Sequence, residues 1–180
     1  MSILNGDEII KAYNEGKIII DPWDEKKVGT NSYDVTLLPK LKTYLRVILD
    51  PRVKNPTQEI EIPENGYLLK KGNFYLGSTF EYNANKTNDL VPMLEGRSSV
   101  ARLGLTIHIT AGFGDVGFCG RWTLEILPSM DIWVYPRMPI GQLYWVKTSP
   151  TDRFYKGKYQ DQKDIIASKL HMEITDGTGH

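Results

Sequence analysis

The sequence predicts an all-β fold, a barrel or jelly roll preceded by one short helix. Three observations support this. One amphipathic segment lies near the N-terminus, many short runs rich in β-branched and aromatic residues follow it, and Pro, Gly and Asn separate those runs. The length of 180 residues and the hydrophobic content of 41% suit a single domain with a real core.

The helix is predicted to begin at Asn5. Asn5 and Glu8 have the spacing of a capping box, in which each side chain bonds the other residue's backbone N–H. Apolar side chains then recur at Ile9 and Tyr13, and Gly16 provides a stop. The strands are predicted over residues 17–20, 32–37, 41–49, 66–69, 74–82, 105–110, 121–127, 132–135 and 142–146. Residues 150–180 are more polar and are predicted to form a C-terminal tail of the single domain 1–180.

Charge and cysteine content limit the classes of partner and the compartment that we expect. Lys+Arg and Asp+Glu balance at 22 each, so no overall positive field attracts nucleic acid or an anionic membrane. The single cysteine, Cys119, cannot form an internal disulfide, and neither a leader nor an 18-residue apolar run is evident. We therefore expect a soluble, cytoplasmic protein that binds neither nucleic acid nor membrane.

Zinc chemistry is not expected from the available ligands. Zinc deaminases need clustered His and Cys residues, whereas this chain has three widely spaced histidines and one cysteine. His108 lies in an alternating Thr-Ile-His-Ile-Thr run, which favours a strand histidine bonded to its neighbours over a ligand. Cys119 follows Phe118 at a predicted strand edge and is interpreted as a buried packing residue.

A glycine-rich segment, residues 112–117, satisfies G-x-G-x-x-G. The dinucleotide-binding form of this motif opens a helix, but here a strand-like run over 121–126 follows. The segment is therefore predicted to be a turn between strands, with Asp115 as a turn former. Such a turn could also let the backbone and Asp115 approach a ligand closely.

Two further features point toward chemistry without deciding it. Residues 97–102 offer two guanidinium groups and two hydroxyls, which suit capture of phosphate oxygens, although a solvated loop would explain them equally well. Glu125 stands in the apolar run 122–127. It lies either on a solvated strand face with Thr123, or in a functional site where a partly desolvated carboxylate beside an arginine could shuttle protons.

The ordered combination of these motifs resembles the dCTP deaminase family, within the dUTPase-like superfamily. The resemblance rests on residues 95–104, 108–111, Asp115, Gly117, Gly120, 123–125 and 140–143, with a further match at 32–37 and in the tail at 155–162. It implies a dUTPase-like distorted β-barrel of the β-clip or jelly-roll type. It also implies a homotrimer with active sites between subunits, which hydrolyses the 4-amino group of dCTP without zinc.

The resemblance also assigns roles to residues. Glu125 would take a proton from the attacking water, and Ser98 and Arg102 would help to hold that water and the tetrahedral intermediate. Tail residues would close over the triphosphate, which would carry Mg²⁺. The nucleotide-binding set implied is Arg97, Ser98, Ser99, Arg102, Ala111, Asp115, Thr123, Leu124, Glu125, Gln142, Tyr155, Lys158 and Gln162.

One segment differs from the pattern of the deaminases that stop at dUTP, and this difference bears on the reaction. Residues 111–115 read A-G-F-G-D, which is closer to bifunctional members that go on to dUMP and pyrophosphate than to members that stop at dUTP. Asp115 would then activate water at the α-phosphate as a further catalytic residue. Gly114 and Val116 differ from the usual residues and are expected to loosen this turn. Deamination that stops at dUTP, a dUTPase without deaminase activity, and an inactive nucleotide-binding regulator remain alternatives.

Overall fold

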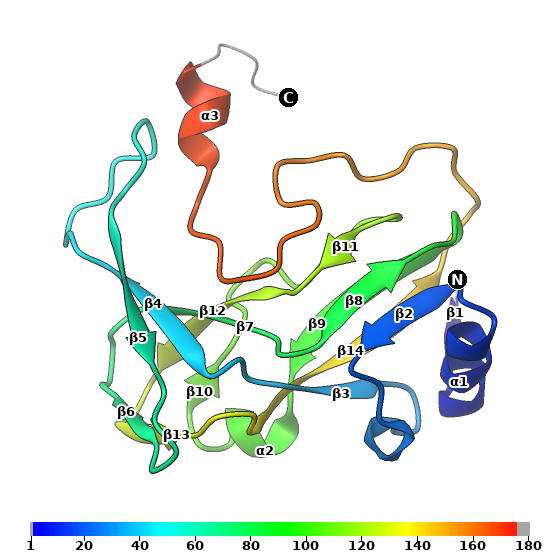
Figure 1. Cartoon of the computed structure of the whole chain (residues 1–180), viewed down its shortest axis with the longest axis horizontal. Coiled ribbons are helices and arrows are strands. Elements are labelled where there is room, and N and C mark those ends of the chain that lie inside the picture. Colours follow the sequence, from blue (N-terminus) through cyan, green and yellow to red (C-terminus); the bar gives the residue numbers. More distant parts are fainter. Residues whose placement is uncertain (1, 176–180) are drawn as a thin grey trace.

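The computed structural model describes residues 2–175 and consists mainly of short strands (Figure 1). The strands are β1 Ser2–Ile3, β2 Ile18–Asp21, β3 Tyr33–Thr36, β4 Lys40–Tyr44, β5 Thr57–Glu61, β6 Tyr67–Leu69, β7 Tyr75–Ser78, β8 Tyr82–Asn85, β9 Leu90–Gly96, β10 Leu105–Thr106, β11 Cys119–Gly120, β12 Thr123–Pro128, β13 Ile132–Val134 and β14 Pro139–Lys147. The helices are α1 Gly6–Asn14, the 3-10 turn η1 Glu25–Lys27, α2 Ser98–Ala101 and α3 Leu170–Thr175.

Two sheets carry most of the structure. In one, β14 pairs with β1, β3 and β9; the other has the order β10-β12-β7-β4-β5. Two smaller sheets, β11-β8-β2 and β13-β6, complete the barrel-like structure. Tyr33, Leu94, Leu124 and Trp145 are fully buried, so side chains from both large sheets share the core. The predicted all-β, barrel-like fold is confirmed.

Helix α1 forms as its sequence predicts. The Asn5 side chain accepts from the Glu8 N–H at 2.9 Å, and Glu8 Oε2 accepts from the Asn5 N–H at 3.0 Å. Ile9 and Ala12 are buried, and Gly16 follows the helix with a positive φ of 68°. No helix in the part of the chain from residue 2 to residue 175 is long and apolar enough to cross a membrane.

Several predicted strand limits are wrong. The run over 41–49 is a strand only to Tyr44, because Val47 and Ile48 lie in an exposed loop without packing partners. The run over 74–82 is divided into β7 and β8 by buried polar residues at 79 and 81. The run over 105–110 keeps only two ladder residues, Leu105 and Thr106. Strands β1, β5, β9 and β11 were not predicted.

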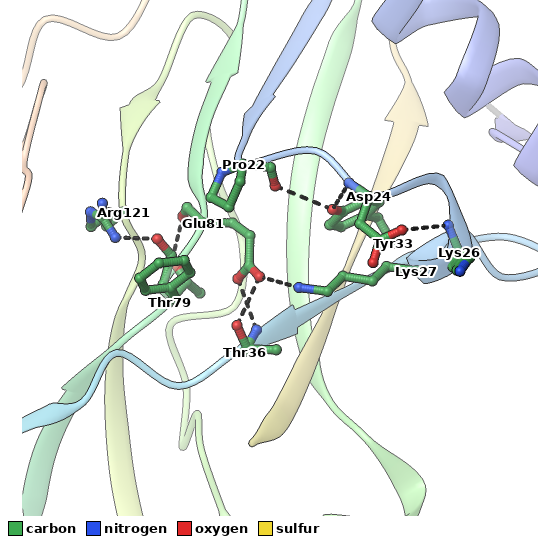
Figure 2. A network of polar contacts seen from close by, with 10 residues as sticks. Pro22, Asp24, Lys26, Lys27, Tyr33, Thr36, Thr79, Glu81 and Arg121 are labelled. Atoms are coloured by element: carbon green, nitrogen blue, oxygen red, sulfur yellow. Dashed lines mark hydrogen bonds and ion pairs between the residues drawn. The ribbon is translucent and has the colours of Figure 1, made fainter. Parts of the chain in front are cut away.

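The break between β7 and β8 is held by a buried polar network (Figure 2). Glu81 is fully buried; its carboxylate accepts from Lys27 Nζ at 2.6 Å and from the backbone N–H and hydroxyl of Thr36 at 2.8 Å. Thr79 Oγ1 donates to the Glu81 carbonyl at 2.9 Å and accepts from the Trp122 N–H at 3.0 Å. The network therefore fixes the chain immediately before β12.

The C-terminal segment 155–168, here called the strap, packs on its own chain. The Arg121 N–H donates to the Gln162 carbonyl at 2.8 Å, and the Asp161 N–H donates to the Cys119 carbonyl at the same distance. Farther along, Lys42 Nζ donates to the Ile165 carbonyl at 2.8 Å. The strap thus extends the edge of β11 and then crosses the exposed face of the β12-β7-β4 sheet. Cys119 itself is buried, as predicted.

Candidate active site

A cavity of about 470 Å³ lies between the strap and the β12-β7-β4 face. Strands, the glycine-rich turn and the strap all contribute walls. Six sequence-predicted residues line it: Ala111, Asp115, Thr123, Glu125, Tyr155 and Gln162. The remaining walls are largely aromatic and aliphatic, including Tyr44, Phe74, Leu76, Phe118, Trp122 and Tyr159.

Alternation along β12 places Glu125 in this cavity. Thr123 and Glu125 face the cavity, whereas Leu124 between them is fully buried in the core on the opposite side. The Glu125 side chain retains 27% of its accessible surface. The structure therefore puts Glu125 on the strand face that it shares with Thr123, and this face lines the cavity; no arginine of the described residues lines it. The side chain of Leu124 cannot reach a ligand there.

His108 makes the closest side-chain contact to Glu125, with Nδ1 2.6 Å from Oε2. The interpretation of His108 as a histidine within a strand is wrong, because β10 ends at Thr106. The register nevertheless explains the contact. Thr106 pairs with Leu127, and extending that antiparallel register by two residues sets His108 opposite Glu125. The T-I-H-I-T alternation was the available signal, but it did not reveal which strand lay opposite.

The glycine-rich turn runs along β9 and leads into β11, as predicted for a turn rather than a dinucleotide-binding loop. The Leu94 N–H donates to the Gly112 carbonyl at 2.9 Å, and the Gly114 N–H donates to the Pro92 carbonyl at 3.0 Å. A Cβ on Gly112 would lie 2.5 Å from the Leu94 carbonyl oxygen, so only glycine permits this approach. The result is that the chain delivers Ala111 and Asp115 to the cavity wall.

Gly114 is tightly packed, contrary to the expectation of a loosened turn. A Cβ at this position would lie 2.6 Å from Cη2 of Trp122 and 2.6 Å from the Pro92 carbonyl oxygen. Trp122 therefore occupies the space that a larger residue at 114 would need, and its ring also packs edge-on against Phe118 at 5.2 Å between centroids. Val116 is itself buried.

Strap residues differ in how they meet the cavity. Tyr155 lines it, and burial together with the nearby Asp115 carboxylate raises the pKa of its phenol, so the hydroxyl stays protonated. Gln162 lines it as well, but its Nε2 donates to the Arg121 carbonyl and thereby secures the strap. Lys158 does not line the cavity; its ammonium forms an ion pair with Glu173.

The remaining predicted residues form a second group, here called the arginine face: Arg97, Ser98, Ser99, Arg102 and Gln142. None of them lines the cavity. Gln142 on β14 pairs in register with Asp34 on β3 and Glu95 on β9, and Arg97 follows β9 as the cap of α2. Arg97 Nη2 lies 3.1 Å from Asp34 Oδ2. In Figure 1, α2 lies at the bottom of the molecule and the strap crosses near the top.

No three His, Cys, Asp or Glu side chains within residues 2–175 gather as a metal site. The carboxylates that line the cavity are those of Asp115 and Glu125. These are hard ligands of the kind that Mg²⁺ accepts together with phosphate oxygens and water.

Comparison with known proteins identifies the family of this chain. The sequence pattern of a family described as dCTP deaminase-like matches residues 3–148. The chain belongs to that family. A relative from Clostridium beijerinckii, named dCTP deaminase, dUMP-forming, is 49% identical over 173 residues, which are 96% of this chain and 98% of the relative. A protein of the same name from Leptospira biflexa is 46% identical over the same shares.

Among solved structures, the dCTP deaminase-like chain resembles the 2'-deoxycytidine 5'-triphosphate deaminase from Agrobacterium tumefaciens. The TM-score is 0.63 at 19% identity, and the match covers 82% of this chain but 48% of the Agrobacterium chain. At that identity the likeness supports the fold alone. The family assignment inferred from the ordered motifs is confirmed by the sequence relatives.

Proposed function

We propose that this chain hydrolyses dCTP to dUTP and ammonia and then hydrolyses dUTP to dUMP and pyrophosphate. One observation carries the proposal: a carboxylate, Glu125, faces a nucleotide-sized cavity with one oxygen bound by His108. The second step is supported by the relatives from Clostridium beijerinckii and Leptospira biflexa, because both are named as dUMP-forming. The A-G-F-G-D run, which delivers Asp115 to the same cavity, supports it too.

Glu125 acts as the general acid/base of the deamination. Its carboxylate removes a proton from a water as the water oxygen bonds to C4 of the cytosine ring. The protonated Glu125 gives that proton to the ring nitrogen N3, then takes the proton of the new C4 hydroxyl and passes it to the departing amine. Breaking the C4–N bond releases ammonia and leaves the uracil carbonyl. Thr123 and Ala111 lie at the cavity wall, where their backbone groups can read the edge of the base.

Asp115 serves the second hydrolysis. Its carboxylate takes a proton from a water that attacks the α-phosphorus, and the bond to the β-phosphate oxygen breaks to release pyrophosphate. Before that step Asp115 holds the deoxyribose. Tyr155 beside it contributes a protonated hydroxyl and an aromatic surface.

The phosphates are bound by the arginine face of a neighbouring copy in a homotrimer. The cavity is lined by two carboxylates and by no Lys or Arg among the described residues, so it cannot neutralise a triphosphate by itself. Arg97 and Ser99 supply phosphate contacts from the second copy, with Gln142 as a further nucleotide contact. Ser98 and Arg102 hold the attacking water and the intermediate. A soluble cytoplasmic enzyme without nucleic-acid or membrane partners fits this assignment.

The tail closes the site from the cavity side. We take residues 1–180 as one domain and residues 150–180 as its tail, of which 176–180 lie outside the described residues. Tyr155, Lys158 and Gln162 belong to the part that covers the triphosphate, and Lys158 must leave Glu173 to reach it. Mg²⁺ is held through the phosphate oxygens, where it neutralises charge; no zinc is involved.

Incubation with dCTP or dUTP and Mg²⁺, followed by separation of the nucleotides, tests the proposal. We expect dCTP to disappear with release of ammonia and with dUMP as the final nucleotide. Persistence of dCTP while dUTP is hydrolysed would identify a dUTPase instead. Accumulation of dUTP would refute the second step, and binding without any turnover would identify a regulator.

A further inference from the structure

We propose that His108 is a positioning residue that orients the Glu125 carboxylate for proton transfer. The contact between His108 Nδ1 and Glu125 Oε2 is 2.6 Å, shorter than an ordinary N–H···O bond. The His108 side chain retains only 6% of its accessible surface. This inference rests on the proposed function, because it gives His108 a role in the reaction at Glu125.

The partners of the two ring nitrogens define the tautomer. An ionised carboxylate only accepts hydrogen bonds, so Nδ1 of His108 carries the hydrogen and donates it to Glu125. Nε2 is buried and has no hydrogen-bond partner within the described chain. Within the described chain the bond to Glu125 is thus the one hydrogen bond of the ring, and it requires the hydrogen on Nδ1.

Packing holds the imidazole in place from two sides. Ile107, which is 2% exposed, packs against the backbone of Gly96 and Gly141, and a Cβ on Gly141 would lie 2.8 Å from its Cδ1 atom. On the other side, the edge of the His108 ring meets Trp122, with centroids 6.4 Å apart and planes at 74°. Since neither the backbone nor the ring can shift freely, the Nδ1–H group has a fixed direction.

The consequence is a carboxylate with two different oxygens. Oε2 of Glu125 is engaged by His108, while no group in residues 2–175 hydrogen-bonds Oε1. The side chain lines the cavity, so Oε1 is the oxygen that can meet a bound water. A single orientation of the base relative to the water is what proton transfer requires. His108 supplies that orientation without touching the substrate.

Three substitutions separate this role from simple packing. The amide nitrogen of His108→Asn can occupy the position of Nδ1, that of His108→Gln reaches instead toward the position of Nε2, and His108→Leu fills the space without a donor. We expect kcat for ammonia release to fall about 100-fold in the Leu and Gln variants, with KM within about threefold of wild type. The Asn variant should recover at least about tenfold of that loss.

An equal kcat in the Leu variant and wild type would overturn the proposal, as would a gain in kcat or an Asn variant no better than Leu. A readout independent of turnover is the ¹⁵N NMR spectrum of the histidine rings. We expect His108 with hydrogen on Nδ1 and a shifted Nδ1 resonance in Glu125→Gln. A His108 ring with its hydrogen on Nε2 alone would refute the hydrogen bond from Nδ1 to Glu125. If wild type released no ammonia but this resonance responded to Glu125→Gln, the proposed function would fail while the orientation of Glu125 by His108 stood.

Discussion

The cavity and the arginine face handle charge in opposite ways. In the cavity, carboxylates face aromatic and aliphatic walls under the strap, and His108 engages one oxygen of Glu125. On the arginine face, Arg97 lies at the surface and is held by a carboxylate, Asp34, with about a third of each side chain accessible. The cavity thus presents carboxylates and no Lys or Arg among the described residues, whereas the arginine face presents guanidinium groups.

This difference suggests how the enzyme is assembled. A nucleoside triphosphate presents a neutral base and a highly charged tail, so it needs both regions within a few ångströms. The two regions belong to different sheets, and no Lys or Arg among residues 2–175 lines the cavity. Bringing the arginine face of one copy to the cavity of the next satisfies both ends of the ligand, and a closed ring repeats the same contact.

The largest effect is expected from Glu125→Gln. The amide keeps the size of the side chain and can still accept from His108, but it cannot take a proton from water. We expect kcat for ammonia release to fall at least about 1,000-fold, with the dissociation constant for dCTP within about threefold of wild type. Isothermal titration and an ammonia assay measure the two quantities. Retained turnover would remove Glu125 from its assigned role.

The second experiment mixes two inactive variants. Arg102 is exposed and its side chain makes no hydrogen bond or ion pair within the described residues, so Arg102→Ala should inactivate without unfolding the chain. After dissociation and reassembly of a 1:1 mixture of Glu125→Gln and Arg102→Ala chains, about a quarter of interfaces should contain both intact regions. We expect about a quarter of wild-type activity. No recovery despite exchange of subunits would place each site within one chain.

Substitution of Arg97 should affect binding more than chemistry. Removing the guanidinium removes charge-assisted bonds to phosphate, so Arg97→Ala should raise the KM for dCTP about 10- to 100-fold, with a smaller change in kcat. Asp34→Asn should produce a smaller rise, because Arg97 stays but is less restricted. The control is Asp50→Asn, which weakens a similar pair with Arg52 on the exposed β4–β5 loop. An equal rise in the control would contradict the assignment.

The sequence revealed those features of the fold and of the cavity that are local. The capping box of Asn5 and Glu8 forms as predicted, and alternation along β12 put Thr123 and Glu125 on one face. These features are local, since they depend on residues a few positions apart. The prediction of a turn at the glycine-rich segment was also correct, because the sequence shows that a strand and not a helix follows it. The assignment of further site residues came from family resemblance rather than from pattern.

What the sequence could not reveal depends on contacts between distant segments. The apolar run after Tyr44 resembles a strand, but no second strand covers Val47 and it remains exposed. Strand β9 was missed because Pro92 disfavours a strand in the sequence pattern, yet the strand continues through it and its carbonyl accepts a hydrogen bond from the Gly114 N–H. The bond between His108 and Glu125 depends on the β10-β12 register, which no local pattern encodes.

The smallest expected effect concerns the attachment of the strap over the cavity. Lys42 lies in register with Leu76, which is in turn paired with Glu125, and its ammonium donates to the Ile165 carbonyl at 2.8 Å. Lys42→Met keeps most of the apolar stem but loses this donor. Because one hydrogen bond contributes about 0.5–1.5 kcal/mol, we expect the KM for dCTP to rise about two- to tenfold with little change in kcat.

Lys40→Met is the matched control for that change. Lys40 stands two residues earlier on β4 and pairs with Glu59 and Glu61, but it makes no hydrogen bond to the strap among the described residues. If Lys42→Met and Lys40→Met raised the KM equally, the effect would belong to surface charge. A rise confined to Lys42→Met would show that the cavity region, unlike the arginine face, depends on a segment closing over it from the same chain.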